Sequence, residues 1–252
     1  MFDPFKDFAT AGYLRNTHAI KDVALIKNIE HDLFLANLPD ALAFLAAQDD
    51  IGYGEYVAVH RILFSDFYPW AGQDRTATAP DIAESKAGLL FSHPKDARRA
   101  VEEGLRLGQL TARMNAQPGL VMGLFAYGHP FLDGNGRTML VVHTELCYRA
   151  AMSINWGRTT KSDYLAALSD EIRRPGAGAL DRYLLGFKEN RLSREVWEQG
   201  ILSIKGLGGV VMDSIEGQFS DALVAGKYRA FDQQRGYKIA DANPTDDARP
   251  GE

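Results

Sequence analysis

The nine residues 129–137 read HPFLDGNGR and gather more chemically active side chains than a turn requires. His129, Asp133, Asn135 and Arg137 lie here around two glycines. A histidine can act as a base near neutral pH. A carboxylate is a hard ligand of the kind that Mg²⁺ accepts alongside substrate phosphates. One segment therefore holds a candidate base and a candidate metal ligand.

The second half of this segment is suited to binding an anion. The following residues, TMLVVHTEL, predict a helix that begins directly after the loop, and the first turn of a helix presents unpaired backbone N–H groups. Gly134 and Gly136 lack side chains, so a phosphate can approach the main chain closely. The Asn135 amide can donate to the same phosphate, and the planar cation of Arg137 suits oxyanions.

These residue types together favour transfer of a phosphate-containing group onto a hydroxyl. His129 would take the hydroxyl proton, while the metal and the N–H groups hold the charged donor. The segment is not a P-loop, because it lacks the order G-x4-G-K-[ST], and no hydrophobic strand precedes it as in a dinucleotide-binding motif. A zinc hydrolase would need three protein ligands, and no second histidine lies at a suitable spacing from His129 and Asp133.

The elements that must position the loop are mainly helices. Apolar spacing predicts helices over residues 21–48, with Pro39 opening a second helix inside that stretch, and over residues 56–67, ending before Pro69. Further helices are expected over residues 96–116, 120–127, 136–151, from an N-capping Ser162 onward, and over 180–187. Residues 71–91 break this pattern with short β-leaning pieces, which predict a hairpin. The expected fold is mainly α, a helical bundle with one small β-hairpin.

Composition limits the class of protein. The chain has 252 residues with 46% hydrophobic content, enough for one large domain or a domain with an appendage. A formal net charge of −5 argues against a general nucleic-acid binder. The single cysteine, Cys147, excludes an internal disulfide framework, fits a reducing compartment and is interpreted as core packing.

No targeting or membrane segment is recognised. The first residues lack a basic stretch followed by an apolar run, and the longest apolar stretch, residues 119–127, is too short to span a membrane. We expect a cytoplasmic protein with no membrane partner, although an effector exported through a tail signal would look the same. Composition also changes after Arg191, so we expect a domain over residues 1–191 and a C-terminal extension over residues 192–252, its last ~15 residues disordered.

HPFLDGNGR resembles the signature of Fic-domain proteins of the Fic/Doc superfamily, H-P-F-x-[D/E]-G-N-G-R-x-x-R. EHDLF, FYPWAGQDRT and KAGLLF look like the lead-in helix, the segment after it and the hairpin flap of that family, so the resemblance covers roughly residues 13–188. It implies a Fic-type helical bundle with a flap. It also implies a protein adenylyltransferase that moves AMP from ATP, with Mg²⁺, to a Ser, Thr or Tyr hydroxyl of a target protein.

The resemblance also implies a role for each residue of the loop. His129 would be the general base, and Asp133 would hold the Mg²⁺ that bridges the donor phosphates. Arg137 would contact the β or γ phosphate, and Phe131 would anchor the loop in the core. The anion hole around the phosphates would be formed by Gly134, Asn135 and Gly136.

The flap would dock the target. The resemblance implies that residues 87–91 would clamp an extended segment of the target protein by strand addition. The residues concerned are Ala87, Gly88, Leu89, Leu90 and Phe91. The aromatic residues just before the hairpin, Phe67, Tyr68 and Trp70, are interpreted as packing beneath it.

One position departs from the family pattern. Leu140 stands three residues after Arg137, where the family has a second arginine associated with the γ-phosphate. The change would weaken ATP anchoring, change the donor or leave the site to another cation, for which Arg75 is a candidate by its place near the flap. Two alternatives stay open: a Fic-fold transferase of UMP, phosphate or phosphocholine, and a catalytically weakened partner-binding module. The Doc-type kinase relatives lack the second glycine of GNG, so Gly134 and Gly136 together favour nucleotidyl transfer.

Inhibition in the family uses a helix with the pattern [S/T]-x-x-x-E-[G/N], carried in the chain or borrowed from an antitoxin. Glu216 and Gly217 are the nearest local match, but Met212 fails the first position of the pattern. We therefore do not expect intramolecular inhibition from this segment. A separately encoded antitoxin or inhibitor remains an expected kind of partner.

Overall fold

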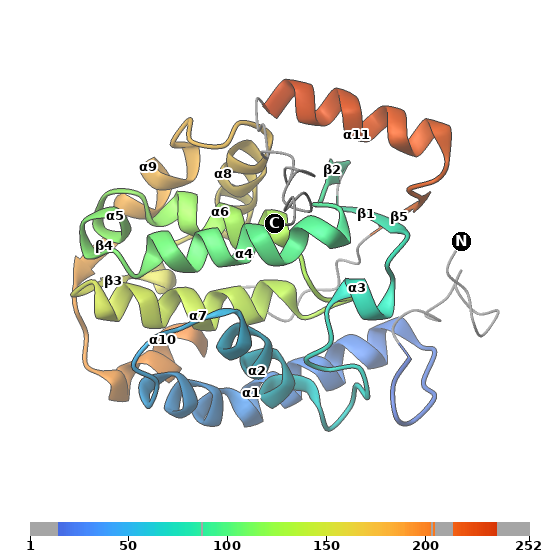
Figure 1. Cartoon of the computed structure of the whole chain (residues 1–252). Helices are drawn as coiled ribbons and strands as arrows, with labels where there is room; N and C mark the ends of the chain where they lie inside the picture. The colour runs from blue at the N-terminus through green and yellow to red at the C-terminus, as the bar shows by residue number, and fades with distance from the viewer. Residues whose placement is uncertain (1–14, 87, 203, 205–213, 236–252) are drawn as a thin grey trace, which may run out of the picture.

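The computed structural model describes residues 15–86, 88–202, 204 and 214–235 (Figure 1). Helices dominate, as the sequence predicts. They are α1 (Val23–Ala46), α2 (Tyr53–Phe64), α3 (Arg75–Thr78), α4 (Pro94–Gly108), α5 (Thr111–Ala116), α6 (Pro118–Gly128), α7 (Asn135–Arg149), α8 (Lys161–Arg173), α9 (Ala179–Leu185), α10 (Trp197–Leu202) and α11 (Ala222–Arg235). Two short 3₁₀ helices are η2 (Trp156–Arg158) and η3 (Arg194–Val196). The strands are β1 (Ile82–Lys86), β2 (Leu89–Leu90), β3 (Met152–Ile154), β4 (Lys188–Asn190) and β5 (Ser214–Gln218).

Helix α7 lies at the centre of the bundle. It packs against α1 and α2 on one side and against α6 on the other, and α6 in turn contacts α4, α8 and α9 (Figure 1). Most residues of α7 are buried because it is surrounded in this way. The loop of residues 129–134 joins α6 to α7, so it is held between two buried helices.

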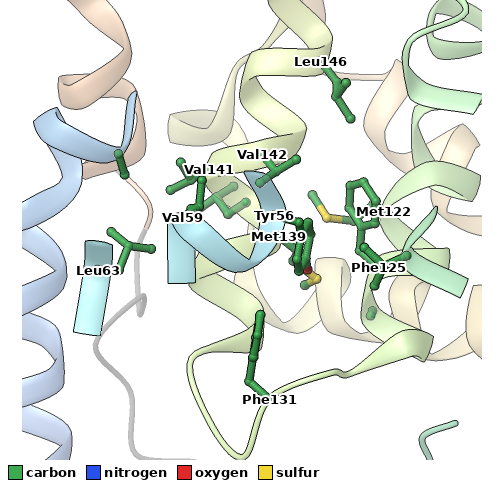
Figure 2. Packing of buried hydrophobic residues seen from close by; sticks show 14 of the residues in the cluster. Tyr56, Val59, Leu63, Met122, Phe125, Phe131, Met139, Val141, Val142 and Leu146 are labelled. Carbon is green, nitrogen blue, oxygen red and sulfur yellow. The ribbon is translucent and has the colours of Figure 1, made fainter. Parts of the chain in front are cut away.

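The core beneath the loop is built from large apolar side chains of α2, α6 and α7 (Figure 2). The ring of Tyr56 lies 5.3 Å from that of Phe125 and 6.0 Å from that of Phe131, measured between centroids. All three residues are fully buried. Burying such rings is strongly favourable, at about 25 cal/mol for each Å² of apolar surface removed from water. The loop is therefore anchored in the buried core of the bundle.

Three local expectations were wrong. Residues 21–48 form one helix rather than two, with Pro39 inside α1, because Leu38, Ala41 and Leu45 continue the buried stripe and this packing outweighs the backbone hydrogen bond that a proline removes. The stretch 96–116 is divided into α4 and α5. Helix α8 begins two residues earlier than expected, since Thr160 rather than Ser162 is the N-cap and accepts from the N–H of Asp163 in the first turn.

The expected hairpin is present as the β1–β2 pair, but it begins later than expected. Ser85 lies opposite Leu90, and Gly88 takes a positive φ of 75° in the turn between the strands. The first part of the stretch, which was read as β-leaning, forms the short helix α3 instead. Its N-cap is Asp74, whose carboxylate accepts from the N–H of Thr76.

The C-terminal segment adds to this hairpin. Strand β5 pairs antiparallel with β1, so the sheet has the order β2-β1-β5, with an irregularity between Ala83 and Glu84. Glu216, the nearest match to the inhibitory pattern, lies in β5 and not in a helix, and its carboxylate accepts from Ser85 and Lys227. The edge of β1 that faces away from β2 is thereby covered.

Other parts of the C-terminal extension also contact the bundle. Helix α10 packs against α1, and α11 packs against α8 and β5. Just before this extension, strand β4 pairs with β3, the strand that follows α7. The expected boundary near residue 191 stays a prediction, and the expected disorder of the last residues falls on 236–252, outside the described residues. Within the described part of the chain, no helix combines the length and hydropathy that a membrane span requires.

Candidate active site

The loop before α7 depends on two residues in the left-handed backbone region. His129 ends α6 with φ 43°, and Gly134 precedes α7 with φ 78°. A side chain at Gly134 would be strained by this φ and would also clash, since an added Cβ would lie 2.6 Å from the ring of Phe64. At Gly136, in contrast, nothing lies within 4 Å of an added Cβ, so the first turn of α7 is open there. The glycines shape the loop and leave its helix N-terminus approachable.

Asn135 and Phe131 close the loop on itself. The Asn135 Oδ1 accepts from the Phe131 N–H at 2.9 Å, and its Nδ2 donates to the Phe131 carbonyl at 2.7 Å. The Asn135 amide, expected to face a phosphate, is engaged by the loop backbone in this structure. Phe131 is fully buried and stacks on the ring of His60 with centroids 3.8 Å apart, in the core position expected of it. The loop is thus fixed before any ligand binds.

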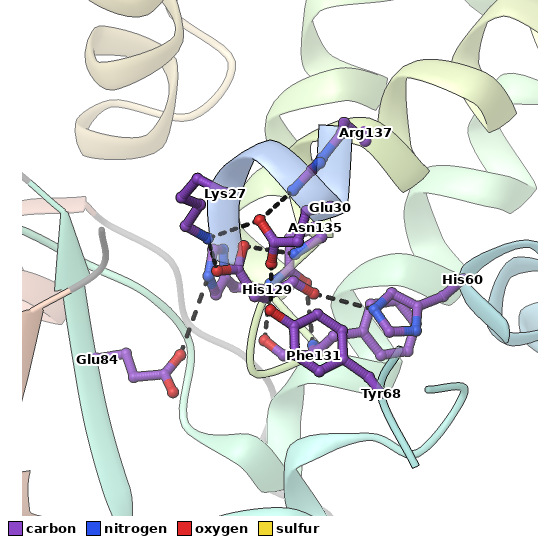
Figure 3. A network of polar contacts seen from close by, with 11 residues as sticks. Lys27, Glu30, His60, Tyr68, Glu84, His129, Phe131, Asn135 and Arg137 are labelled. Carbon is purple, nitrogen blue, oxygen red and sulfur yellow. Dashed lines mark hydrogen bonds and ion pairs between the residues drawn. The ribbon is translucent and has the colours of Figure 1, made fainter. Parts of the chain in front are cut away.

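His60 supports the backbone of the loop (Figure 3). Its Nδ1 accepts from the Gly72 N–H at 2.9 Å, so its Nε2 carries the proton and donates to the Asp133 carbonyl at 3.0 Å. Complete burial lowers the pKa of His60 to about 3, although the bond to Asp133 acts in the opposite direction. His60 is therefore a neutral structural residue that orients the backbone of Asp133.

His129 is held on three sides. Its carbonyl accepts from the Arg75 Nε at 2.7 Å. Its Nε2 lies 3.9 Å from a carboxylate oxygen of Glu84, a fully buried residue of β1 (Figure 3). Its ring stacks on Phe91 with centroids 3.6 Å apart. The candidate base is only 6% exposed and has a defined orientation.

Arg75 does not replace the missing second arginine. It is fully buried, donates to the carbonyls of His129 and Ser92, and lies 3.5 Å from the Glu84 carboxylate. Its own N–H donates to the Pro130 carbonyl at 2.7 Å. Its partners lie in the loop, in β1 and directly after the flap, so Arg75 ties α3 to the loop and to the hairpin.

Four charged side chains meet above the first turn of α7 (Figure 3). Arg137 donates to the Glu30 carboxylate at 2.8 Å, and Glu30 also accepts from Lys27 at 2.9 Å and from the Tyr68 hydroxyl at 2.6 Å. Lys27 contacts the Asp133 carboxylate as well. Burial alone would lower the pKa of Lys27, but these two carboxylates outweigh burial and raise it. Lys27 is therefore an ammonium ion, and one turn of α1 engages both the candidate metal ligand and the candidate phosphate-binding arginine.

The loop opens onto a cavity of about 330 Å³. One end is polar and contains His129, Asp133, Gly136 and Arg137. The other end is mostly apolar and aromatic, with residues from α7, η2, α8 and the segment after α10. They include Met139, Leu140, Trp156, Tyr164, Leu168 and Ile204. A cavity with one charged end and one apolar end suits a ligand with a phosphate group and a flat ring.

The flap borders the same cavity. Leu89 and Phe91 line it, as does Lys86 from β1, whereas Leu90 is buried in the hairpin on the other side. Gly88 forms the turn, and Ala87 lies outside the described residues. Strand β2 therefore lies beside the candidate base, while β5 forms the opposite edge of the sheet.

The described residues of the cavity offer a magnesium ion a single carboxylate, that of Asp133. Among the described residues, no three His, Cys, Asp or Glu side chains gather as a metal cage. Asp133 is the one acidic side chain among the described residues that line the cavity. Mg²⁺ is commonly held by one or two carboxylates together with substrate phosphates. Asp133 thus suits a cation that arrives with a nucleotide.

Several supporting residues were missed by sequence reasoning. Lys27 and Glu30 lie on the same helix face as the buried Ile26 and Phe34. Charged residues on an otherwise apolar helix face were the signal in the sequence that these two side chains are buried and paired. His60 likewise lies on the buried face of a predicted helix, one residue after Val59. Glu84 gave no comparable signal, because its contact with His129 depends on how the flap folds back. Cys147, interpreted as core packing, is buried in α7, and so is His143, for which the sequence left a structural and a surface position open.

Comparisons with known proteins agree on the family. The family model of the Fic/DOC family matches residues 50–147. A probable protein adenylyltransferase of Sinorhizobium fredii, y4lH, is 30% identical over 166 residues, which cover 62% of this chain and 81% of the relative. Protein adenylyltransferase VbhT of Bartonella schoenbuchensis is 26% identical over 174 residues, 66% of this chain, and the match spans only 35% of VbhT.

Solved structures agree on the fold. The crystal structure of the BepC protein of Bartonella tribocorum with bound AMPPNP matches with a TM-score of 0.56 at 17% identity, covering 71% of this chain and 93% of that one. A Fic domain from Bartonella quintana with bound ADP gives the same TM-score at 18% identity, covering 70% and 91%. With the HPFLDGNGR loop in place at the head of α7 and the flap beside it, the chain belongs to the Fic/DOC family.

Proposed function

We propose that this protein transfers AMP from ATP to a hydroxyl side chain of a target protein. The observation that supports this most is the placement of His129 and the open first turn of α7 in one cavity. A base and an anion-binding helix terminus side by side are what transfer of a phosphate-containing group requires. That relatives are named protein adenylyltransferases favours AMP as the transferred group.

In the proposed reaction, the target hydroxyl oxygen forms a bond to the α-phosphorus of ATP. The bond from that phosphorus to the oxygen bridging the α and β phosphates breaks, and pyrophosphate leaves. The hydroxyl proton passes to the imidazole of His129, which the Glu84 carboxylate stabilises in its protonated form. Gly134, Asn135 and Gly136 supply the helix terminus for the phosphates, and Arg137 supplies a positive charge beside it.

Asp133 would hold Mg²⁺, which neutralises phosphate charge when it is bound. The apolar end of the cavity, near Trp156 and Tyr164, would take the nucleoside. The flap residues Gly88, Leu89, Leu90 and Phe91 would dock the target beside His129 by strand addition along β2. Action in the cytoplasm and control by a separately encoded inhibitor stay predictions.

The second candidate is transfer of another phosphate-containing group by the same residues. Leu140 favours it, because this apolar side chain lies in the cavity one turn after Arg137 and offers no charge to a terminal phosphate. Incubation of the protein with a cell lysate and ATP labelled at either the α or the γ phosphate separates the candidates. AMP transfer labels a target from α-labelled ATP alone. Label from γ-labelled ATP alone would instead establish kinase activity.

A further inference from the structure

Lys27 is a cation of the cavity that none of the roles above uses. It comes from the second turn of α1, it is 6% exposed, and it lines the polar end of the cavity. Its ammonium contacts the carboxylates of Glu30 and Asp133. An ammonium has three donors, and these two carboxylates account for two of them.

The charges around the loop balance in this structure. Lys27 and Arg137 are positive, and Glu30 and Asp133 are negative. A nucleoside triphosphate brings several negative charges to this end of the cavity, and a divalent cation that binds Asp133 takes over the carboxylate that Lys27 now contacts. The ammonium and that cation repel each other, so Lys27 keeps Glu30 but loses the second of its two anionic partners. Phosphate oxygens are the nearest chemistry that supplies one.

We propose that Lys27 binds the terminal phosphates of the donor nucleotide, exchanging its contact with Asp133 for phosphate oxygens while Glu30 keeps hold of it. This inference rests on the proposed function, which supplies the class of donor. It adds a residue, Lys27, that would distinguish a nucleoside triphosphate from a monophosphate. A lysine suits the exchange because its ammonium is a point charge on a flexible stem, with no planar geometry to match.

Burial distinguishes Lys27 from the other lysines of the cavity. Lys86 from β1 is half-buried and Lys161 from α8 is exposed, and both border the cavity away from α1. A charge removed from water interacts more strongly with a phosphate than one at the surface. Leu140 makes Lys27 more important for binding the terminal phosphates, because the next turn of α7 after Arg137 contributes no cation.

The test is nucleotide binding measured by calorimetry in Mg²⁺, which needs neither a target protein nor turnover. Lys27→Gln removes the charge but keeps an amide donor for Glu30 and Asp133. Lys27→Arg keeps the charge. Lys95→Met, on the exposed part of α4 outside the cavity, is the control for net charge.

We expect Lys27→Gln to weaken ATP binding about tenfold or more and AMP binding less than twofold, because AMP lacks the terminal phosphates. Lys27→Arg should keep the preference for ATP, and Lys95→Met should leave both affinities unchanged. Equal weakening of ATP and AMP by Lys27→Gln, or no change in either, would overturn the proposal.

A second variant tests the same point by rescue. Leu140→Arg places a guanidinium in the same cavity, one helical turn after Arg137. Combined with Lys27→Gln, it should restore ATP affinity at least partly while AMP affinity stays constant. Absence of rescue in a protein that melts as sharply as the wild type would contradict the proposal. If Leu140→Arg does not fold, the comparison of Lys27→Gln with Lys27→Arg decides. Failure of the wild type to transfer AMP would defeat the proposed function and leave this binding result standing.

Discussion

The rings of His129 and Phe91 lie in parallel planes, with centroids 3.6 Å apart and an angle of 4° between them. His129 belongs to the loop before α7, and Phe91 directly follows the flap strand β2. The flap is therefore part of the support of the candidate base as well as a border of the cavity. Movement of the flap would alter the orientation of the imidazole.

Replacing Phe91 tests this support. Phe91→Ala should lower kcat for AMP transfer about tenfold or more, because the imidazole loses the ring that sets its plane. Phe91→Tyr keeps the ring and should retain most of the rate. Steady-state kinetics on a purified target gives both values, and an Ala variant as fast as the Tyr variant would show that the stacking does not matter for the reaction.

Glu84 is predicted to stabilise the protonated form of His129. Its carboxylate oxygen lies 3.9 Å from Nε2 inside the protein, so Glu84→Gln should lower kcat at least about tenfold while the KM for ATP changes little. Glu216→Gln on the neighbouring strand β5 is the matched control, because its partners are Ser85 and Lys227 rather than His129. A rise in KM without a fall in kcat would mean that Glu84 acts on ATP binding instead.

The loop and the fold class could be predicted because their signals are local. HPFLDGNGR places its side chains and glycines within nine residues, and the apolar run after it predicts the helix that the loop requires. The hairpin was found in the same way, from Pro and Gly punctuation. In each case the residues that decide the structure are neighbours in the sequence.

The support of the loop could not be predicted because it is assembled across the chain. Lys27 and Asp133 are 106 positions apart, and Glu84 reaches His129 only when the flap packs on the loop. Asn135 looked like a phosphate donor by residue type, yet a backbone partner four residues away engages its amide. Pro39 looked like a helix start, and burial on both sides of it kept α1 continuous.

The C-terminal segment is predicted to brace the flap. Phe219, directly after β5, lies against the ring of His93 with centroids 3.9 Å apart and the planes tilted by 33°, and it also contacts Tyr228 of α11 edge-on. Phe219→Ala should therefore loosen β5 and speed hydrogen exchange at the amides of β1. Leu223→Ala, at a side chain that is 79% exposed, is the control and should leave exchange unchanged. Equal protection of β1 in both variants would show that β5 is held without this contact.

Because His60 is buried in its neutral form, we expect the folded protein to lose stability in mild acid. Its pKa is lowered to about 3 in the folded protein, against about 6.5 in the unfolded chain, so between these values the unfolded state binds more protons. Stability from this group is complete above pH 6.5 and falls as the pH falls towards 3. From pH 7 to pH 5 the loss is about 2 kcal/mol.

Urea unfolding at pH 7 and pH 5 measures this loss. His60→Gln retains a donor for the Asp133 carbonyl and an acceptor for Gly72 but does not titrate in this range. The variant should therefore lose less stability than the wild type between the two pH values, by about 2 kcal/mol. Identical losses in the two proteins would show that His60 is not held neutral.

The most direct test of the central claim is mass spectrometry of a target protein after incubation with ATP and Mg²⁺. The wild-type protein should add one AMP to a Ser, Thr or Tyr side chain, and His129→Ala, which removes the base but leaves Arg137 and the helix terminus in place, should reduce that adduct about a hundredfold or more. An AMP adduct formed equally well by His129→Ala would contradict the assignment of His129, and a target carrying phosphate or another group in place of AMP would contradict adenylyl transfer.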